Sequence, residues 1–382
     1  MSEPIRILQV LTAMNFAGAE TLLMNLYRNI DRSKVQFDFA VTVDHECAYD
    51  AEIRRLGGKI IHYPLYRGVN HFAYISWWTH FFKKHPEYPI VHGHIGSTAA
   101  IYLHIANQFG RFTIAHSHST SSHRLNLHDF LYSIFSFPTR YIADFFMGCS
   151  RDALVDRYGQ SVLRHSNHCI LNNGIDAKKY VYSQKTREDI RAELHIAKDE
   201  IVIGTVGRLT PQKNPPFIIR IIKELENQNI KFRFIWVGVG EKEAEIKKAI
   251  SYELEKETVI MTGARADVNR VLQAMDIFIL PSLWEGLPVA GIEAQAADLP
   301  SLFTQGLTSE LSITDRCCFL PMNDLDSWVQ KIKSIINSGE FRTRKSRYDE
   351  IKANKFDILD TAKWLQDFYL SQVRNERWKN KT

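Results

Sequence analysis

Residues 276–304 read DIFILPSLWEGLPVAGIEAQAADLPSLFT, and this stretch decides the fold. Its opening apolar run predicts a buried strand, the residues around Glu293 predict a helix, and the last five residues predict a second strand. A strand, a helix and a strand in this order build a parallel sheet whose faces are covered by helices. Glu285 is therefore expected at the carboxyl end of a strand, and Glu293 about two turns later, inside the helix.

The same alternation of short apolar runs and amphipathic stretches continues along the chain in both directions. It predicts an α/β protein of two similar doubly wound modules, joined near LNNGIDAKKY at 171–180. In the first half we expect strands at 5–11, 35–43, 59–64, 89–94, 112–118, up to 150 and at 168–176, and helices at 17–30, 50–57, 72–85 and 97–110. In the second half we expect strands at 200–208, 231–238, 258–263, 276–282 and 300–304, and helices at 215–228, 241–254, 267–275, 289–297, 324–339 and 357–373.

The length of the chain sets the expected domain boundaries. A chain of 382 residues is too long for one ordinary hydrophobic core. We expect a first domain at 1–172, a second at 173–355 and a final helix at 356–375. The most apolar region, 130–150, is interrupted by Pro138 and by charged residues, so it predicts a buried helix leading into a strand.

Composition excludes several classes of protein. Five cysteines without Cys-x-x-Cys spacing argue against a disulfide framework or a zinc cluster and favour a reducing compartment. The chain begins without a signal-like segment and has no run of about 18 uninterrupted apolar residues. We therefore expect a cytoplasmic protein with no nucleic-acid partner. Its basic, histidine-rich first half leaves peripheral contact with an anionic membrane as an alternative to ordinary surface charge.

Two strand-to-helix turns carry candidate binding residues, because open parallel sheets bind ligands at the carboxyl ends of their strands. In TAMNFAGAET, Gly18 lets the backbone approach a ligand, although a turn that only packs the helix is the alternative. In GTVGRLTPQKN, Arg208 and Lys213 precede a helix N-terminus, where cations oppose the helix dipole. If a diphosphate binds between these cations and the helix amides, their position at the positive end of the helix dipole is explained. The alternative is that both are solvated surface charges.

The loop between Glu285 and Glu293 is the third candidate. The amides of GLPV, which ends at Val289, open the helix and can face an anion. Glu285 can orient sugar hydroxyls, and Glu293 can accept both hydroxyls of a ribose, as an acidic residue does in dinucleotide sites. A helix-terminal charge and an exposed glutamate are the alternative.

Other patterns favour ordinary packing. The aromatic residues of HFAYISWWTHFFKKH, at 71–85, predict a core helix, with docking of a lipid-linked acceptor at a membrane as the alternative. VHGH, HSHSTSSH and HDF contain possible metal ligands, but no carboxylate or cysteine stands at matching spacing. We expect these histidines to make local polar and acceptor contacts. Cys317 and Cys318 predict a buried pair in a strand.

Residues 1–375 resemble a retaining glycosyltransferase of family 4, with the GT-B fold of two Rossmann-like domains facing across a cleft. The resemblance rests on FAGAE, LNNGID, GRLTPQKN, TGARADVNRVLQAMDIFILPS and EGLPVAGIEAQAADLP, in this order. Glu285 and Glu293 match the family's E-x7-E motif. The subgroup it resembles contains exopolysaccharide and capsule glycosyltransferases. The resemblance implies an acceptor-binding first domain, a donor-binding second domain and a final helix that crosses back to the first.

The resemblance also implies a role for each candidate residue. Arg208 and Lys213 match the pair that grips the donor diphosphate. Glu285 matches the carboxylate that holds the hydroxyls of the donor sugar, and Glu293 the one that binds the ribose. Gly18 matches a glycine whose amide faces the diphosphate.

Three further residues follow from the same comparison of motifs. His116 matches a histidine near the donor sugar, and the sequence does not separate it from His118. Arg265 and its neighbours lie where the edge of the base would be met. Arg265 and one of the two histidines, which the sequence does not identify, are expected to contact the donor.

The chain also departs from the family pattern. Ala17 precedes Gly18 where the family often has two glycines. Many members of the family read E-G-F-G-L-P, and in this chain Pro288 comes two positions earlier. Asp298 stands where glycine is common, and aspartate can adopt the left-handed conformation at some cost.

The resemblance implies transfer with retention, by attack on the face from which the diphosphate leaves, and closure of the domains around the donor. Negative charge develops on the leaving diphosphate, and Arg208, Lys213 and helix amides can stabilise it where a metal would otherwise be needed. We therefore expect a hexosyltransferase that needs no metal and no cofactor. Its co-substrate would be a nucleotide-sugar, with a UDP-sugar first, and its acceptor a saccharide, lipid-linked in surface polysaccharide synthesis.

Three other hypotheses compete with this one. A nucleotide-sugar 2-epimerase of the same fold would use the same diphosphate site, but the paired motif argues against it. A catalytically silent subunit of this fold would be expected to lack the key cations or carboxylates, which are all present. A nicotinamide dehydrogenase is disfavoured because no G-x-G-x-x-G follows the first strand.

Overall fold

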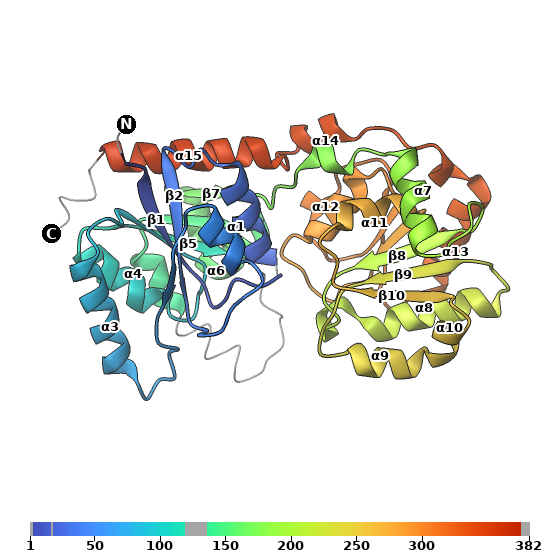
Figure 1. The fold of residues 1–382 in the computed structure, drawn as a ribbon, viewed down its shortest axis with the longest axis horizontal. Helices are drawn as coiled ribbons and strands as arrows, with labels where there is room; N and C mark the ends of the chain where they lie inside the picture. Colours follow the sequence, from blue (N-terminus) through green and yellow to red (C-terminus); the bar gives the residue numbers. More distant parts are fainter. Residues whose placement is uncertain (1–2, 17, 119–135, 376–382) are drawn as a thin grey trace. The chain divides into compact units, whose positions relative to one another are not determined.

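The computed structural model describes residues 3–16, 18–118 and 136–375. The chain forms two compact units: the first unit is Met1–Gly174 with Asp357–Thr382, and the second unit is Ile175–Phe356. Each unit is a parallel sheet with helices on both faces (Figure 1). This arrangement confirms the predicted doubly wound α/β architecture.

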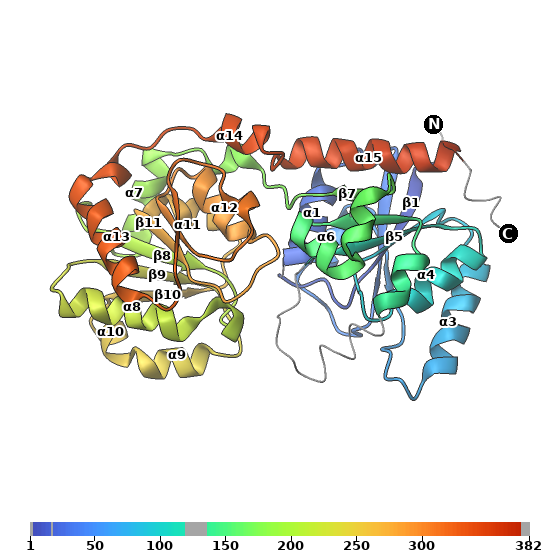
Figure 2. The same ribbon diagram turned by 180° about the vertical axis from the view of Figure 1, so that it is seen from behind.

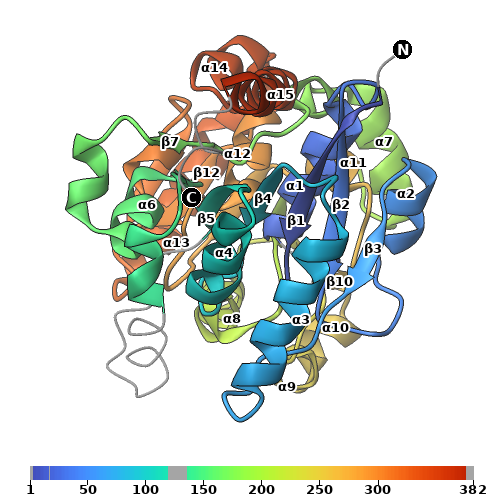
Figure 3. The same ribbon diagram turned by 90° about the vertical axis from the view of Figure 1, so that its left-hand side faces the viewer.

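The first unit contains a seven-stranded sheet with the order β3-β2-β1-β4-β5-β6-β7, in which every pairing is parallel. Figure 3 shows this order from β3 on the right to β7 on the left. The strands are β1 (Ile5–Val10), β2 (Val35–Val41), β3 (Ile60–His62), β4 (Ile90–Gly93), β5 (Phe112–Ser117), β6 (Phe145–Gly148) and β7 (His168–Ile170).

Helices bury their apolar residues against both faces of this sheet. One face packs against α1 (Gly18–Asn29), α2 (Asp50–Arg55) and α15 (Ile358–Asn375). The other face packs against α3 (His71–Lys84), α4 (Ala99–Gln108) and α6 (Arg151–Tyr158). Short 3-10 helices η1 (Phe137–Tyr141) and η2 (Gln160–Arg164) flank β6 and α6.

The last helix, α15, belongs to the first unit although the second unit precedes it in sequence. Leu365 and Tyr369 are fully buried in the same core cluster as Tyr27 of α1 and Phe37 of β2. A hydrogen bond of 2.8 Å from Asp31 N to Gln366 Oε1 also joins α15 to the end of α1. Figure 2 shows α15 running across the top of this unit, above α1 and the strands.

The second unit contains a six-stranded parallel sheet with the order β10-β9-β8-β11-β12-β13. Helices α8 and α13 fill one face with aliphatic and aromatic side chains, and α7, α11, α12 and α14 form the other layer. The strands are β8 (Val202–Val206), β9 (Arg233–Val237), β10 (Val259–Gly263), β11 (Ile277–Leu280), β12 (Ser301–Thr304) and β13 (Cys317–Leu320). The helices are α7 (Gln184–Glu193), α8 (Pro215–Asn227), α9 (Glu243–Ala249), α10 (Ser251–Glu255), α11 (Val268–Ala274), α12 (Val289–Ala296), α13 (Leu325–Ser338) and α14 (Tyr348–Ala353), with 3-10 helices η3 (Ala177–Tyr180), η4 (Pro211–Lys213), η5 (Ser309–Leu311) and η6 (Glu340–Arg342).

Several details differ from the sequence-based expectation. The single helix expected at 241–254 is two helices, α9 and α10, because the backbone of Ile250 leaves the helical conformation with ψ 26°. Ile250 is β-branched, and Ser251 can hydrogen-bond to nearby backbone groups, so both residues favour helices poorly. Cys317 and Cys318 are only partly buried. Of the region 130–150, residues 130–135 lie outside the described residues, and the rest forms η1 and β6.

Helix α7 was not expected from the sequence because its buried face is polar. Arg187 and Arg191 form ion pairs of 2.6 and 2.8 Å with the two carboxylate oxygens of Asp276. The predicted left-handed conformation of Asp298 is confirmed, with φ 55°. Its carboxylate is buried and accepts a hydrogen bond of 2.6 Å from Arg347 Nε.

Candidate active site

The second unit brings Lys213 and Glu285 together where the strand order of its sheet reverses. The strand order reverses between β8 and β11, which lie side by side. Open α/β sheets bind ligands at such a switch point, outside the carboxyl ends of the strands. The chain leaves β8 into Gly207 and Arg208, and it leaves β11 into the loop that carries Glu285.

Glu285 is held by two donors from the segment that connects β8 to α8. Lys213 Nζ donates to Glu285 Oε1 in an ion pair, and Gln212 Nε2 donates to Glu285 Oε2 at 3.1 Å. The Glu285 side chain is only 9% exposed. Gly207 leaves room for this pair, because a Cβ at residue 207 would lie 3.0 Å from Lys213 Cε. Sequence analysis named Lys213 and Glu285 but missed Gln212, since a lone glutamine in a loop carries no signal.

Glu293 lies on α12 and pairs with Tyr180 of η3. Tyr180 Oη donates to Glu293 Oε1 at 2.5 Å. Burial raises the pKa of Glu293, and the hydrogen bond from Tyr180 offsets part of that rise. Burial and the neighbouring carboxylate raise the pKa of Tyr180. Sequence analysis missed Tyr180 because 113 residues separate the two partners.

The predicted helix terminus is present. Helix α12 begins at Val289, and Pro288 precedes it in an extended conformation without a side-chain cap. The first N–H groups of any helix lack intrahelical partners, so this end can face an anion. Val289 therefore stands at the amide-rich end of α12, as the sequence predicted.

The two predicted arginines of this unit differ in their surroundings. The Arg208 side chain is exposed, and within the described part of the chain it makes no hydrogen bond or ion pair. Arg265 donates to both carboxylate oxygens of Asp267, at 2.7 and 2.8 Å, and to Glu193 at 2.6 Å. These carboxylates raise the pKa of Arg265. The guanidinium of Arg265 is thus held in place locally, and its contact with a base stays a prediction.

Gly18 belongs to the first unit, where it is the first residue of α1. A Cβ at residue 18 would meet no atom of the described residues within 4 Å. The described part of the first unit therefore leaves space beside this backbone, consistent with a close approach by another molecule. Its neighbour Ala17 lies outside the described residues.

His116 and His118 lie in a cluster of four imidazoles in the first unit. His92 and His94, at the end of β4, are their neighbours: His92 Nε2 lies 3.2 Å from His116 Nδ1, and His94 Nδ1 lies 2.8 Å from His118 Nε2. Burial, aided by neighbouring imidazoles, holds the pKa values of His92, His94 and His116 well below their usual range. Burial alone lowers the pKa of His118 to about 4. All four side chains are therefore neutral at pH 7.

The predicted contact of His116 or His118 with a donor sugar stays a prediction. His123 of HSHSTSSH and His128 of HDF lie outside the described residues. The sequence predicted only local polar contacts for these histidines. In the structure, His92 and His94 of VHGH form one cluster with His116 and His118 of HSHSTSSH.

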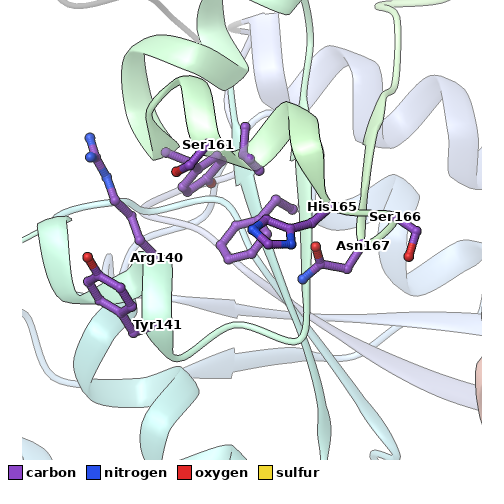
Figure 4. Close-up of a pocket in the computed structure, with 9 residues that line it drawn as sticks. Arg140, Tyr141, Ser161, His165, Ser166 and Asn167 are labelled. Carbon is purple, nitrogen blue, oxygen red and sulfur yellow. The ribbon is translucent and has the colours of Figure 1, made fainter.

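A pocket of about 460 Å³ in the first unit lies elsewhere. Figure 4 shows its labelled side chains, among them Arg140, Tyr141, His165 and Asn167. Arg140 and Tyr141 precede β6, and Asn167 precedes β7, so this pocket faces the amino ends of the strands. None of the predicted site residues lines it. Ligand binding in such sheets occurs at the opposite ends of the strands, so we assign no catalytic role to this pocket.

Two further features bear on metal and membrane chemistry. The chain has one Asp-x-Asp sequence, at Asp324 and Asp326. Asp324 caps α13 by accepting a hydrogen bond of 3.1 Å from Ser327 N. None of the helices in the described ranges has both the length and the apolar character needed to cross a membrane.

Comparison with known proteins places the chain in a family. The family model described as "Glycosyl transferases group 1" matches residues 186–351. "Putative glycosyltransferase EpsF" of Bacillus subtilis (strain 168) is 32% identical over 314 residues, which are 80% of this chain and 80% of that protein. "UDP-Gal:alpha-D-GlcNAc-diphosphoundecaprenol alpha-1,3-galactosyltransferase" of Escherichia coli is 26% identical over 212 residues, 54% of this chain and 55% of that protein.

A solved structure has the same fold. The crystal structure of Anabaena Alr3699/HepE in complex with UDP aligns with a TM-score of 0.77 and 16% identity, over 96% of this chain and 100% of that chain. Its likeness concerns the fold alone. The likeness to this structure shows that the chain has the GT-B fold. The family model and the long match to the Bacillus subtilis relative show that the chain belongs to the group 1 glycosyltransferase family.

Proposed function

We propose that this glycosyltransferase moves a hexose from a UDP-sugar to a lipid-linked saccharide, with retention of the anomeric configuration, during surface polysaccharide synthesis. The observation that carries the proposal is the contact of Lys213 and Gln212 with Glu285 at the β8–β11 switch point. This contact joins a group that can neutralise a phosphate to a group that can hold sugar hydroxyls. A sugar diphosphate needs both groups side by side.

The chemistry follows from the charges of these groups. Cleavage of the bond between the anomeric carbon and the phosphate oxygen leaves the electron pair, and hence negative charge, on the diphosphate. Lys213, the exposed Arg208 and the amides before and at Val289 stabilise that charge. Glu285 accepts hydrogen bonds from the donor sugar and stabilises the positive charge that develops on its ring. The acceptor hydroxyl attacks the same face and passes its proton to the departing phosphate.

Relatives support the choice of donor and acceptor class. The Escherichia coli relative carries a UDP-galactose donor and a diphosphoundecaprenol-linked acceptor in its name. The Anabaena neighbour of the same fold was crystallised with UDP and with UDP-glucose. A "Putative colanic acid biosynthesis glycosyltransferase WcaL" of Escherichia coli is 30% identical over 141 residues, 33% of this chain and 34% of that protein. For Glu293 we propose the ribose of the nucleotide as the partner.

A transfer assay tests the proposal directly. The full chain is incubated with UDP-, GDP- and ADP-hexoses and with GlcNAc-diphosphoundecaprenol, with and without a chelator, and the lipid products are analysed by mass spectrometry. We expect one UDP-hexose to extend the lipid, with a rate that the chelator leaves unchanged. The anomeric coupling of the product, measured by NMR, should match that of the donor.

Matched variants link the activity to the site. Glu285→Gln should lower the rate of transfer by more than about 100-fold, whereas Glu245→Gln on the surface of α9 should not change it. Consumption of the donor without extension of the lipid would instead identify an epimerase. Failure of every nucleotide to raise the melting temperature would identify a silent subunit, and inversion at the anomeric carbon would refute the mechanism.

We also propose that the first unit touches the membrane that holds the acceptor. Three apolar side chains around the start of α3 are exposed: Leu65 by 52%, Val69 by 97% and Phe72 by 85%. The exposed Arg67 lies between them in sequence and suits an anionic headgroup. The other large aromatic residues of α3 are buried or half-buried, as expected for a core helix. Figure 3 shows this connection at the lower end of α3.

Co-sedimentation with vesicles tests this contact. The full chain should bind vesicles that contain phosphatidylglycerol, and Val69→Ser with Phe72→Ser should reduce the bound fraction by roughly 10-fold. Tyr252→Ser removes a side chain of the second unit that is 56% exposed and should change nothing. Equal binding of all three proteins would refute the role of this loop.

A further inference from the structure

Two neighbouring strands of the first unit each carry a His-x-His sequence at their carboxyl ends. His92 and His94 stand at the end of β4, and His116 and His118 stand at the end of β5. The strands are parallel and paired, with His92 opposite Ile114. Because residues two apart point to the same face of a sheet, the four imidazoles converge on one side of this edge.

The distances within this cluster suit a shared ion. One ring nitrogen from each of His92, His94 and His116 can be chosen such that all three lie within 4.8 Å of one another. His92 Nε2 and His116 Nδ1 are 3.2 Å apart. Two nitrogens bound to one tetrahedral Zn²⁺ at about 2.0–2.1 Å lie about 3.3 Å from each other. The observed spacing therefore needs little adjustment.

Outer partners orient two of these rings. His94 Nε2 lies 2.8 Å from Gln9 Oε1, and because this oxygen can only accept, Nε2 carries the proton. The lone pair of His94 is then on Nδ1, which faces the cluster. His92 Nδ1 lies 2.6 Å from Tyr369 Oη, so its Nε2 faces inward. Histidines that bind metals are held in this way by a partner on their outer nitrogen.

The cluster also contains unsatisfied polar atoms. His116 Nε2 and His118 Nδ1 are buried and have no hydrogen-bond partner among the described residues. A buried polar atom without a partner costs stability, but these orphan nitrogens are not the ones that face the cluster, which are His116 Nδ1 and His118 Nε2.

We propose that His92, His94 and His116 bind one divalent transition-metal ion, with Zn²⁺ as the best match. Imidazole nitrogens favour Zn²⁺, Ni²⁺ and Cu²⁺, whereas Mg²⁺ and Ca²⁺ prefer oxygen ligands. His118 Nε2 lies 2.8 Å from His94 Nδ1. A small rotation of the His118 side chain would make it a fourth ligand of the ion. The ion would fasten the ends of β4 and β5 to each other and, through Tyr369, to α15.

Metal titration of the untagged full chain tests the site without an activity assay. After treatment with a chelator, Co²⁺ should bind in a 1:1 ratio and develop the strong visible absorption of a four-coordinate site. One equivalent of Zn²⁺ should then abolish that absorption. X-ray absorption of the zinc-loaded wild-type protein should count three or four imidazole ligands, a measurement that needs no variant.

Variants locate the ion. His94→Gln should weaken Zn²⁺ binding by more than roughly 100-fold, and Tyr369→Phe, which removes only an outer partner, by about 10-fold. His80→Gln and His104→Gln alter exposed histidines of the same unit and should leave binding unchanged. Circular dichroism checks that each variant is folded. Absence of stoichiometric binding by the folded wild type, or a bound zinc without imidazole ligands, would overturn the proposal. Neither the stoichiometry of metal binding nor the identity of the ligands is measured through transfer activity.

Discussion

Tyr180 and Glu293 form a hydrogen bond of 2.5 Å between a buried phenol and a partly buried carboxyl. The pair joins η3, at the start of the second unit, to α12, which follows the loop of Glu285. Burial makes the charged form of Glu293 unfavourable, and Tyr180 partly compensates. The proposed ribose contact needs the carboxylate, so this pair tunes how the site responds to pH.

Tyr180→Phe should therefore shift the pH profile of nucleotide binding. Without the phenol the pKa of Glu293 rises further, because a donor to its charged form is lost. UDP affinity, measured by calorimetry from pH 5 to 8, falls as the pH drops through the pKa of Glu293, and in the variant this fall should occur at higher pH. Near that pH we expect roughly 10-fold weaker binding. Tyr252→Phe, on the surface, is the control, and superimposable profiles would exclude the coupling.

Glu293→Gln should stabilise the protein while it weakens UDP binding. The folded state holds the proton of Glu293 more tightly than the unfolded chain does, so the free energy of unfolding falls as pH rises from the usual glutamate range through the raised pKa. Glutamine removes this loss and still accepts a hydrogen bond from Tyr180. Urea unfolding at pH 7 should show a gain of about 1 kcal/mol, and the gain should vanish in acid. A loss of stability at pH 7 would contradict this account.

Arg208→Gln should separate activity from stability. The Arg208 side chain is exposed and lacks a partner among the described residues, so its loss should change the free energy of unfolding by less than about 0.5 kcal/mol. Its positive charge is proposed to act on the leaving diphosphate, so kcat/KM should fall by about 100-fold. Lys248→Met, a charge removed from the surface of α9, controls for net charge. Unchanged kcat/KM would remove Arg208 from the site.

Gly18→Ala should fold as well as the wild type. The added Cβ meets no atom of the described residues within 4 Å, and alanine is the better helix former at this first position of α1. The melting temperature should thus be unchanged or slightly higher. If a diphosphate approaches this backbone closely, as predicted, the methyl group should raise KM for the UDP-sugar by roughly 10-fold. A variant with normal kinetics would show that Gly18 only begins the helix.

The sequence predicted the strands well, since each is a short apolar run that a parallel sheet buries on both faces. Helix α7 escaped prediction because it buries Arg187 and Arg191 on Asp276, and a polar buried face leaves no apolar periodicity. The stretch 241–254 was predicted as one helix because its apolar periodicity continues across Ile250. The backbone leaves the helical conformation at this residue, so two helices form.

The candidate site was predictable where one motif contains it. Glu285, Glu293 and Lys213 lie in strand-to-helix turns whose function follows from the position of the turn in a parallel sheet. Their partners Gln212 and Tyr180 were not predictable, because their roles depend on side-chain contacts across 73 and 113 residues. The histidine cluster needs the pairing of β4 with β5, which spacing along the chain does not reveal.

The place of α15 affects how the protein is made. The first unit buries Leu365 and Tyr369 in its core, so its early strands wait for residues that are synthesised only after the whole second unit. The second unit, Ile175–Phe356, is one continuous segment and is complete before then. Synthesis thus reverses the usual order, in which N-terminal domains fold first. Nascent chains that stop before α15 expose an apolar face of the first unit, and chaperones and proteases can recognise them as incomplete.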